Sequence, residues 1–184
     1  MKRTLLFTLL TTIMLTSCSK PQAARAQTTS QALVTYFSAT GTTKAVAQRL
    51  AQVADADLWE IAPAQAYTSA DLDWRDKSSR SSLEMNDDTA RPTLKSTKTD
   101  IARYDTIYIG FPIWWYVAPR IINSFIEAHD LAGKVLIPFA TSGGSPIGPC
   151  VDALRKSYPG LQWHDGRLLN RASEQTLRAW VEGK

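Results

Sequence analysis

The chain has 184 residues, of which 44% are hydrophobic, so it can bury one well-packed core but hardly two. Its 21 Lys and Arg residues nearly balance 17 Asp and Glu residues. No basic run is interleaved with aromatic residues, which argues against a nucleic-acid partner. We therefore expect one domain that does not bind nucleic acid.

The first 17 residues have the parts of a secretory signal peptide in the right order. Lys2 and Arg3 give a positive start, and residues 4–14, "TLLFTLLTTIM", are apolar but too few to span a bilayer permanently. Residues 15–18, "LTSC", resemble the lipobox of bacterial lipoproteins, in which the cysteine carries the lipids. We predict an exported lipoprotein, held by acyl chains on Cys18 at a membrane in the periplasm or cell envelope. An ordinary cleaved signal or a chance cysteine is the alternative.

A flexible tether is expected between the lipid anchor and the domain. Residues 18–31 contain "SKPQAARAQTTSQ" after the cysteine and show no apolar periodicity, so the domain is expected to span residues 32–184. Loss of Lys2 and Arg3 leaves 19 basic and 17 acidic residues, a net charge of +2. Lipidation of Cys18 would leave Cys150 as the single free thiol, with no intramolecular disulfide.

The first elements of the domain are a buried strand, a polar loop and a helix. Residues 32–37, "ALVTYF", are nearly all apolar, which is typical of a parallel strand covered on both faces. Residues 42–54 follow with apolar residues on one helical stripe, and a second strand is expected at 57–63.

Some forty residues then separate Pro63 from Tyr104, more than a usual crossover needs. This connection carries balanced charges, and Ser69 could cap a short helical turn. Trp74, Leu83 and Met85 are available to pack downward. One interpretation is a solvated, partly helical cover; the other is a part of the site wall.

The strand, loop and helix order returns later in the chain. Strands are expected at residues 106–110, at the start of 134–149 and within 161–169, and helices at 119–128, 150–158 and 173–182, the last capped by Ser173. Alternating strands and helices predict a three-layer α/β fold with right-handed crossovers. In such folds the loops at the carboxyl ends of the strands share one rim, where ligands bind.

The loop "SATGTT", residues 38–43, lies between the first strand and its helix. Backbone N–H groups, the positive end of the helix and several hydroxyls would converge there on an anion, and Gly41 permits a tight approach. A simple turn and cap is the alternative. Because the chain has neither G-x-x-x-x-G-K-[ST] nor a G-x-G-x-x-G after a strand, a mononucleotide phosphate is favoured.

Three segments, "SATGTT", "GFPIWW" and "ATSGGS", each follow a buried strand and together resemble the flavin-binding loops of flavodoxin-like proteins. The segments "YTSADLDWRDKSSRS" and "RP" extend the resemblance to a bacterial subgroup of that family. The resemblance covers about residues 32–182. It implies a flavodoxin-like three-layer sandwich with a five-stranded parallel sheet in order 2-1-3-4-5, and FMN as cofactor at the strand ends.

The resemblance also assigns the residues of the FMN site by position. The phosphate would lie against Ser38, Thr40, Gly41, Thr42 and Thr43. The ring would lie beside Pro112, Ile113, Trp114, Trp115 and Tyr116, with Thr141, Ser142, Gly143, Gly144 and Ser145 completing the pocket near the ring and ribityl chain.

Two arguments from the residues support this assignment. Three consecutive aromatic residues, 114–116, cannot all enter one core after a strand end, so at least one should face a flat ligand or solvent. Packing of each indole under the long connection is the alternative. The segment "TSGGS" is expected to offer bare backbone N–H groups to ring carbonyl oxygens.

Other chemistries are disfavoured. Ser145 lies in "GGSPI", which misses the G-x-S-x-G nucleophile elbow, so a hydrolase is not expected. His129 and His164 are far apart in sequence and are expected to be structural or exposed, and we assign no metal. Cys150 sits at a helix start that could lower a thiol pKa, although an inert packed thiol is the main expectation.

The sequence thus predicts an FMN-binding redox protein. As an oxidoreductase it would pass electrons from a reduced donor, such as NADH or NADPH, to a quinone-like or other small acceptor. Alternatives are a one-electron carrier that docks to a protein partner and an interaction module without FMN. A nicotinamide donor conflicts with export, because reduced nicotinamide is not ordinarily expected outside the cytoplasm.

Overall fold

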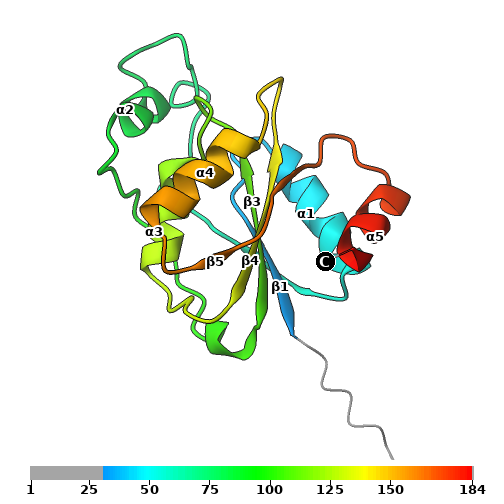
Figure 1. Cartoon of the computed structure of the whole chain (residues 1–184). Coiled ribbons are helices and arrows are strands. Elements are labelled where there is room, and N and C mark those ends of the chain that lie inside the picture. The colour runs from blue at the N-terminus through cyan, green and yellow to red at the C-terminus, as the bar shows by residue number, and fades with distance from the viewer. Residues whose placement is uncertain (1–30, 184) are drawn as a thin grey trace, which may run out of the picture.

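The computed structural model describes residues 31–183, in which helices cover both faces of one parallel sheet (Figure 1). The predicted signal peptide (1–17), Cys18 and all of the predicted tether except its last residue lie outside the described residues. Within the described part of the chain, no helix is long and apolar enough to cross a membrane.

The sheet runs in the order β2-β1-β3-β4-β5, and every pair is parallel. This order confirms the predicted flavodoxin-like arrangement. A short additional strand, β6, pairs with β4 beyond the end of β5. The strands are β1 (Ala32–Tyr36), β2 (Asp57–Glu60), β3 (Thr106–Pro112), β4 (Val135–Thr141), β5 (Gln162–Trp163) and β6 (Arg167–Leu168).

The helices form two outer layers. Figure 1 shows α1 and α5 on one face of the sheet and α3 and α4 on the other. Two buried clusters match these layers, because the apolar residues of β1, β3 and β4 pack partly against one pair and partly against the other. The helices are α1 (Thr42–Val53), α2 (Arg80–Asn86), α3 (Arg120–Glu127), α4 (Gly148–Ser157) and α5 (Glu174–Glu182), with a 3₁₀ turn at Ile101–Arg103.

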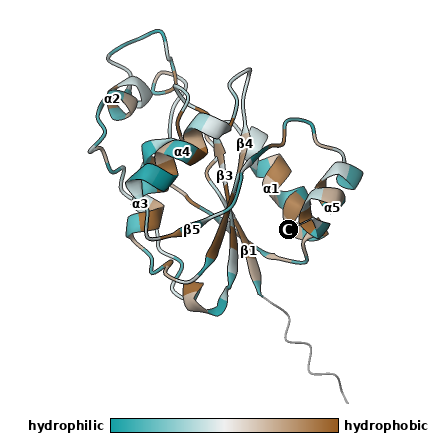
Figure 2. Cartoon of the chain, viewed as in Figure 1, coloured by the Kyte–Doolittle hydropathy of each residue, from teal (hydrophilic) through white to brown (hydrophobic). Residues whose placement is uncertain are grey.

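Local sequence explains the core elements. In α3, Ile121, Ile122, Phe125 and Ile126 recur at helical spacing and are buried, so the helix is held by one apolar face. The central strands are instead buried on both faces, which matches their nearly continuous apolar sequences. Figure 2 shows this contrast, with hydrophobic colour concentrated along the central strands and on the sides of the helices that face them.

The long connection (residues 63–104) carries α2 at the carboxyl-terminal end of the sheet (Figure 1). Polar contacts fix it to itself and to the core domain. The Arg80 guanidinium donates to Gln65 O at 2.8 Å and pairs with Glu84, while Arg120 of α3 pairs with Asp88. The connection is therefore attached at several points along its length.

Three differences from the sequence-based expectations concern β2, the fifth strand and the helix caps of the connection. Strand β2 ends at Glu60 rather than Pro63, because Pro63 forms an antiparallel bridge with Leu94 of the connection. The fifth strand is split into β5 and β6. The turn that Ser69 was expected to cap is capped by its neighbour Thr68, whose hydroxyl accepts from Asp71 N–H at 3.2 Å, and α2 is capped separately by Ser79, whose hydroxyl accepts from Ser82 N–H.

Candidate functional site

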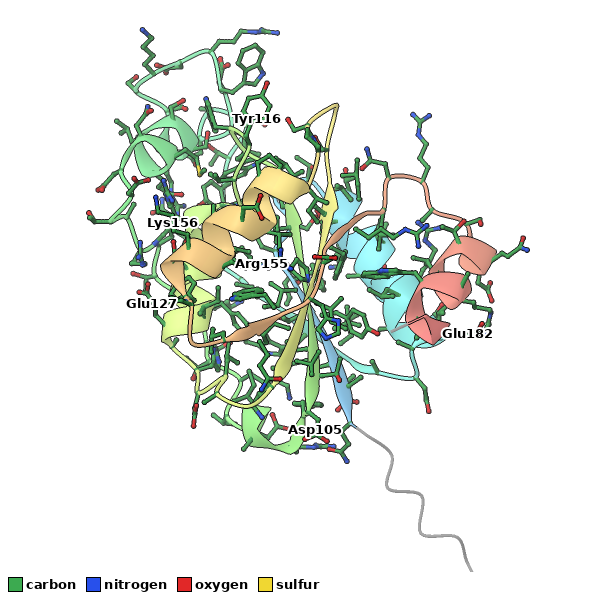
Figure 3. The ribbon with its side chains drawn as sticks, viewed as in Figure 1. Asp105, Tyr116, Glu127, Arg155, Lys156 and Glu182 are labelled. Carbon is green, nitrogen blue, oxygen red and sulfur yellow. The ribbon has the colours of Figure 1, made fainter. Side chains whose placement is uncertain are left out.

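Three loops meet at the carboxyl-terminal end of the sheet, as the parallel topology requires. A buried hydrogen bond of 2.8 Å joins the hydroxyls of Thr43, at the start of α1, and Thr141, at the end of β4. Two of the loops are thereby tied together across the sheet. Figure 3 shows Tyr116, from the third loop, at this end of the molecule and Asp105 at the opposite end.

The hydroxyl loop (residues 38–43) leaves the start of α1 open. Gly41 has a φ of 89°, a left-handed conformation that suits glycine. Helix α1, like α3 and α4, has no side-chain cap and no acidic residue in its first turn, whereas Ser79 caps α2 and Ser173 caps α5. The first N–H groups of a helix lack intrahelical acceptors, so an anion can bind there.

The aromatic hairpin (residues 114–117) follows β3. Trp114 and Val117 exchange backbone hydrogen bonds of 3.1 and 3.0 Å. The two residues between them, Trp115 and Tyr116, have φ values of 47° and 65°. This is type I′ geometry, which usually requires Asn-Gly. The turn thus holds two bulky residues in strained backbone while their side chains remain 44% and 62% exposed.

Trp114 behaves differently from its two neighbours. Its ring packs edge-on against Phe37 and Tyr67, with centroids 5.6 and 5.5 Å away. The Tyr67 hydroxyl donates to Glu84, and burial together with this carboxylate raises the pKa of Tyr67. The base of the hairpin is therefore fixed to the long connection. The expectation that at least one of the three aromatics faces solvent or a ligand is met by Trp115 and Tyr116.

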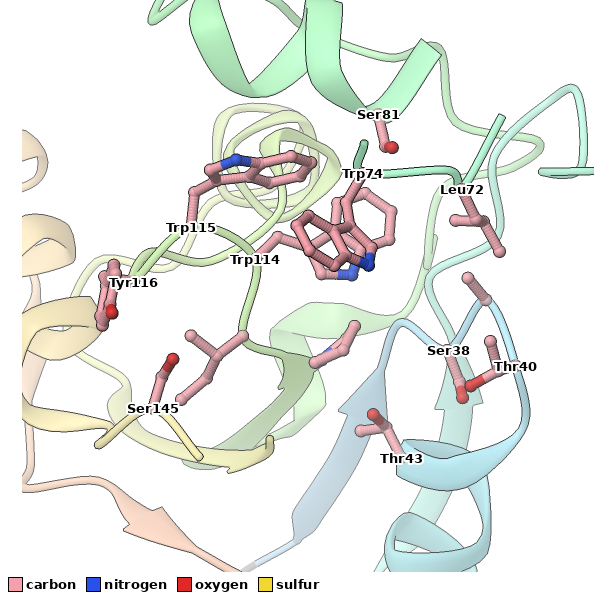
Figure 4. A pocket seen from close by; sticks show the side chains of 13 residues that line it. Ser38, Thr40, Thr43, Leu72, Trp74, Ser81, Trp114, Trp115, Tyr116 and Ser145 are labelled. Atoms are coloured by element: carbon pink, nitrogen blue, oxygen red, sulfur yellow. The ribbon is translucent and has the colours of Figure 1, made fainter. Parts of the chain in front are cut away.

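A first cavity of about 530 Å³ lies between these loops and the connection (Figure 4). Indole rings line one side of it, and the Ser38, Thr40 and Thr43 hydroxyls line another. Leu72, Trp74 and Ser81 reach it from the connection. The connection is thus part of the cavity wall, which was the second of the two interpretations from sequence.

A second cavity of about 660 Å³ shares Thr40 and residues 112–114 with the first. Its remaining lining comes from the start of α1, the end of β4 and the segment after β6. Those residues are Thr42, Thr141, Ser142, Gly143, Asn170 and Arg171.

Most of the residues predicted from sequence come together at these cavities. Every one except Gly41 and Gly144 lines one cavity or both. Gly41 instead shapes the backbone. Sequence reasoning did not assign six lining residues: Ala39, Leu72, Trp74, Ser81, Asn170 and Arg171.

The backbone of the glycine loop (residues 141–145) corrects one expectation. Its N–H groups are mostly not bare. Ser142 N–H donates to Asn170 Oδ1 at 2.9 Å, and the N–H groups of Gly144 and Ser145 donate to Ser142 Oγ at 3.1 and 2.8 Å. A local serine turn and an asparagine from the C-terminal segment therefore satisfy three amides that were expected to face a ligand.

Cys150 lies beneath the aromatic hairpin. Its thiol is fully buried and donates to Tyr116 O at 3.2 Å. Burial raises the pKa of Cys150 to about 11, so the helix start does not activate it. Of the two expectations from sequence, the structure supports an inert, packed thiol and not a thiol whose pKa is lowered by the helix start. Its contact with the hairpin gives it a supporting role.

The histidines show no catalytic arrangement. His129 accepts from Lys98 N–H at Nε2 and contacts Phe125 O through Nδ1 at 2.7 Å, which is a structural role. His164 is exposed. Across residues 31–183, no group of three or more His, Cys, Asp or Glu side chains is placed to hold a metal ion.

Comparisons with known proteins agree with this geometry. A family model described as flavodoxin matches residues 31–184. A protein from Bacteroides eggerthii, provisionally named a flavoprotein, is 58% identical, with a TM-score of 0.82 over 83% of this chain and 96% of its own. A second protein with the same provisional name, from Bacteroides uniformis, is 56% identical, with a TM-score of 0.81 over 83% of this chain and 97% of its own.

A more distant structure shares the fold. The flavoprotein from Lactobacillus acidophilus, solved in complex with FMN, is 22% identical, with a TM-score of 0.62 over 76% of this chain and 93% of its own. No curated protein matched the chain.

Proposed function

The chain belongs to the flavodoxin family, and we propose that it binds FMN at the two cavities and works as an oxidoreductase. It would pass electrons from a reduced donor to a quinone-like or other small acceptor. The observation that carries the proposal is the pairing of an uncapped helix start with an aromatic-walled cavity on the same rim.

The residues present fit the two ends of FMN. The start of α1, with the Thr40 and Thr42 hydroxyls beside it, can hold a phosphate dianion without any metal. Trp115 and Tyr116 can lie against a flat ring, because aromatic faces stack on planar systems. The Lactobacillus acidophilus relative was solved with FMN, which supports the same cofactor here.

When bound, FMN would supply the redox chemistry, as an acceptor and donor of hydride or single electrons. The chain's own residues bind and orient it. The Thr43–Thr141 bond keeps the hydroxyl loop and the end of β4 in register, and the Trp114 cluster fixes the hairpin that would lie beside the ring. No side chain of this site is required to act as a general acid.

The wall contributed by the connection favours an enzyme over a carrier. Leu72, Trp74 and Ser81 make the site concave, which suits a small molecule that must lie against the ring. One observation supports the alternative, a carrier that docks to a protein partner. Trp74, Trp115 and Tyr116 are all substantially exposed, and exposed aromatic side chains are common at protein interfaces.

A spectrum and a turnover assay test the proposal. Residues 31–184, which the family model covers, would be purified and titrated with FMN. We expect binding with a shifted flavin spectrum, followed by oxidation of NADH or NADPH with a soluble quinone as acceptor. Bound flavin without turnover by either donor would favour the carrier. A protein that leaves the FMN spectrum unchanged would refute the proposal.

We also propose that Cys18 anchors the protein to a membrane on the exported side. Mass spectrometry of the full-length protein from cells should find residues 1–17 removed and acyl chains on Cys18. The Cys18→Ser variant should leave the membrane fraction. In that location a donor other than reduced nicotinamide would be needed, so nicotinamide turnover in vitro and lipidation in cells are separate measurements. An unmodified Cys18 would refute the anchor only.

A further inference from the structure

The segment after β6 brings a cation to the hydroxyl loop. Arg171 lines the second cavity together with Thr40 and Thr42. Within the described part of the chain, it is the single charged residue among those lining either cavity. Lys44, in the first turn of α1, approaches Glu60 at 3.9 Å instead.

Both neighbours of Arg171 are held by hydrogen bonds from elsewhere in the fold. Asn170 is bonded in both directions to the Ser142 backbone, accepting from its N–H and donating to its O. Ala172 O accepts from the Arg49 guanidinium of α1 at 2.6 Å. The backbone of residue 171 is thus fixed between the end of β4 and α1.

Between these two contacts, Arg171 has a φ of 50°. A non-glycine residue in this region is strained, and such strain persists only where the surrounding structure enforces it. The side chain is exposed and makes none of the ion pairs found in the described chain. The fold therefore fixes the backbone of Arg171 in a strained conformation at the cavity, and the side chain that extends from it carries no ionic partner in the described chain.

We propose that Arg171 is a specificity-determining residue that binds the phosphate of FMN and makes the site prefer FMN to riboflavin. This inference rests on the proposed FMN site. A phosphate monoester carries a charge of about −1.5 to −2 at pH 7 and three acceptor oxygens, which match a guanidinium. The hydroxyls of Thr40 and Thr42, neutral donors, share the cavity with it. In this proposal the phosphate is bound by the start of α1, by the two threonine hydroxyls and by the Arg171 guanidinium.

The test compares two ligands that differ only in the phosphate. FMN and riboflavin would each be titrated into the flavin-free chain and its Arg171→Gln variant, with flavin fluorescence as the readout. We expect the substitution to weaken FMN binding about tenfold, as for the loss of one charge-assisted hydrogen bond. Riboflavin binding should be unchanged. Arg171→Lys should recover part of the FMN affinity.

Arg167→Gln is the matched control, because Arg167 is also exposed but lines neither cavity. It makes the same change in net charge and should leave both affinities unaltered. Equal weakening by Arg167→Gln would mean that overall charge is responsible, which would overturn the inference. Equal weakening of FMN and riboflavin by Arg171→Gln would place the side chain at the ring and would overturn it too.

Two further measurements separate binding from a structural role. Arg171→Gly relieves the positive φ, so it should keep or raise the melting temperature while still weakening FMN. A loss of stability with unchanged FMN affinity would contradict the inference.

The second measurement is the pH dependence of binding. Below about pH 6 the phosphate loses one charge, so the FMN affinities of wild type and Arg171→Gln should converge. If wild type binds no FMN, the proposed function fails; if both proteins bind it equally, only Arg171 is wrong.

Discussion

The hydroxyl loop and the aromatic hairpin solve the same backbone problem in opposite ways. Both place residues at positive φ on the rim of the sheet. The hydroxyl loop uses Gly41, which adopts this conformation without strain, whereas the hairpin uses Trp115 and Tyr116, for which it costs on the order of 1 kcal/mol or more each. We infer that the hydroxyl loop contributes to the site through its backbone, whereas the aromatic hairpin contributes through its side chains.

The two segments also differ in what holds them. The hydroxyl loop is secured at its helix end by the buried Thr43–Thr141 bond. The hairpin depends on the ring contacts of Trp114 and on the Cys150 thiol, which donates to Tyr116 O. Substitutions at these residues can therefore test each half of the comparison separately.

Gly41→Val should have the largest effect. Nothing lies within 4 Å of a Cβ at residue 41, so the cost comes from a β-branched residue at positive φ and not from a clash. We expect the free energy of unfolding to fall by about 2 kcal/mol and FMN affinity to fall about a hundredfold. Urea denaturation and FMN titration would measure these changes.

Gly144→Ala is the control for that substitution. Gly144 also has open space around it, but its φ is not in the left-handed region and it lines neither cavity. Its stability should change by less than about 0.5 kcal/mol. Comparable losses in both variants would show that the loop does not depend on glycine geometry at residue 41.

Thr43→Val should have the next largest effect. We expect it to lower the free energy of unfolding, measured by urea denaturation, by about 1 to 2 kcal/mol. The substitution keeps the shape but leaves the Thr141 hydroxyl buried without its partner. Because the cost lies in the orphaned group, the double variant Thr43→Val with Thr141→Val should lose less than the sum of the single variants. Thr42→Val, at an exposed residue, is the matched control and should be nearly neutral. Additive single losses would contradict the coupling.

Much of the rim could be predicted because its signals are local. A buried strand followed by a Ser, Thr and Gly loop is visible in the sequence, and parallel topology alone brings such loops to one edge. This holds for residues 38–43 and for residues 112–116. The Ser173 cap of α5 was also predicted from adjacent sequence and is confirmed.

The parts of the site that were not predicted depend on contacts between residues that are distant in the sequence. Trp74 reaches the cavity because the connection is fastened by pairs such as Arg120 with Asp88, which no sequence pattern reveals. Arg171 follows a two-residue strand whose pairing with β4 is a tertiary feature. The strained turn at Trp115 and Tyr116 opposes local preference, so sequence rules for turns would not find it.

The double variant Trp115→Asn with Tyr116→Gly tests whether the hairpin is kept for its side chains. Asn-Gly suits a type I′ turn, so we expect the free energy of unfolding to rise by about 1 kcal/mol while FMN affinity or quinone turnover falls. Trp74→Asn removes another exposed indole from a residue without positive φ, so it should give no gain in stability. If the double variant binds and turns over like wild type, the strain serves no site function.

The smallest expected effect concerns the thiol under the hairpin. The pKa of Cys150 is raised to about 11 by burial, above the ordinary value of 9.0. The folded protein therefore retains its proton where the unfolded chain releases it, so the stability from Cys150 is complete below pH 9 and declines as the pH approaches 11. Between pH 8 and pH 9.5 the free energy of unfolding should fall by about 0.8 kcal/mol through Cys150.

Urea denaturation of wild type and Cys150→Ser at both pH values isolates this change. Buried tyrosines such as Tyr36, whose pKa is raised to about 12 by burial and by Glu60, titrate in both proteins and cancel in the difference. Serine can still donate to Tyr116 O but does not ionise in this range, so its stability should decline less. Equal declines would mean that the thiol is reached by solvent, and that the hairpin opens more readily than its contacts imply. In that case the strained turn would be a mobile segment of the rim, and the hydroxyl loop alone would be preorganised.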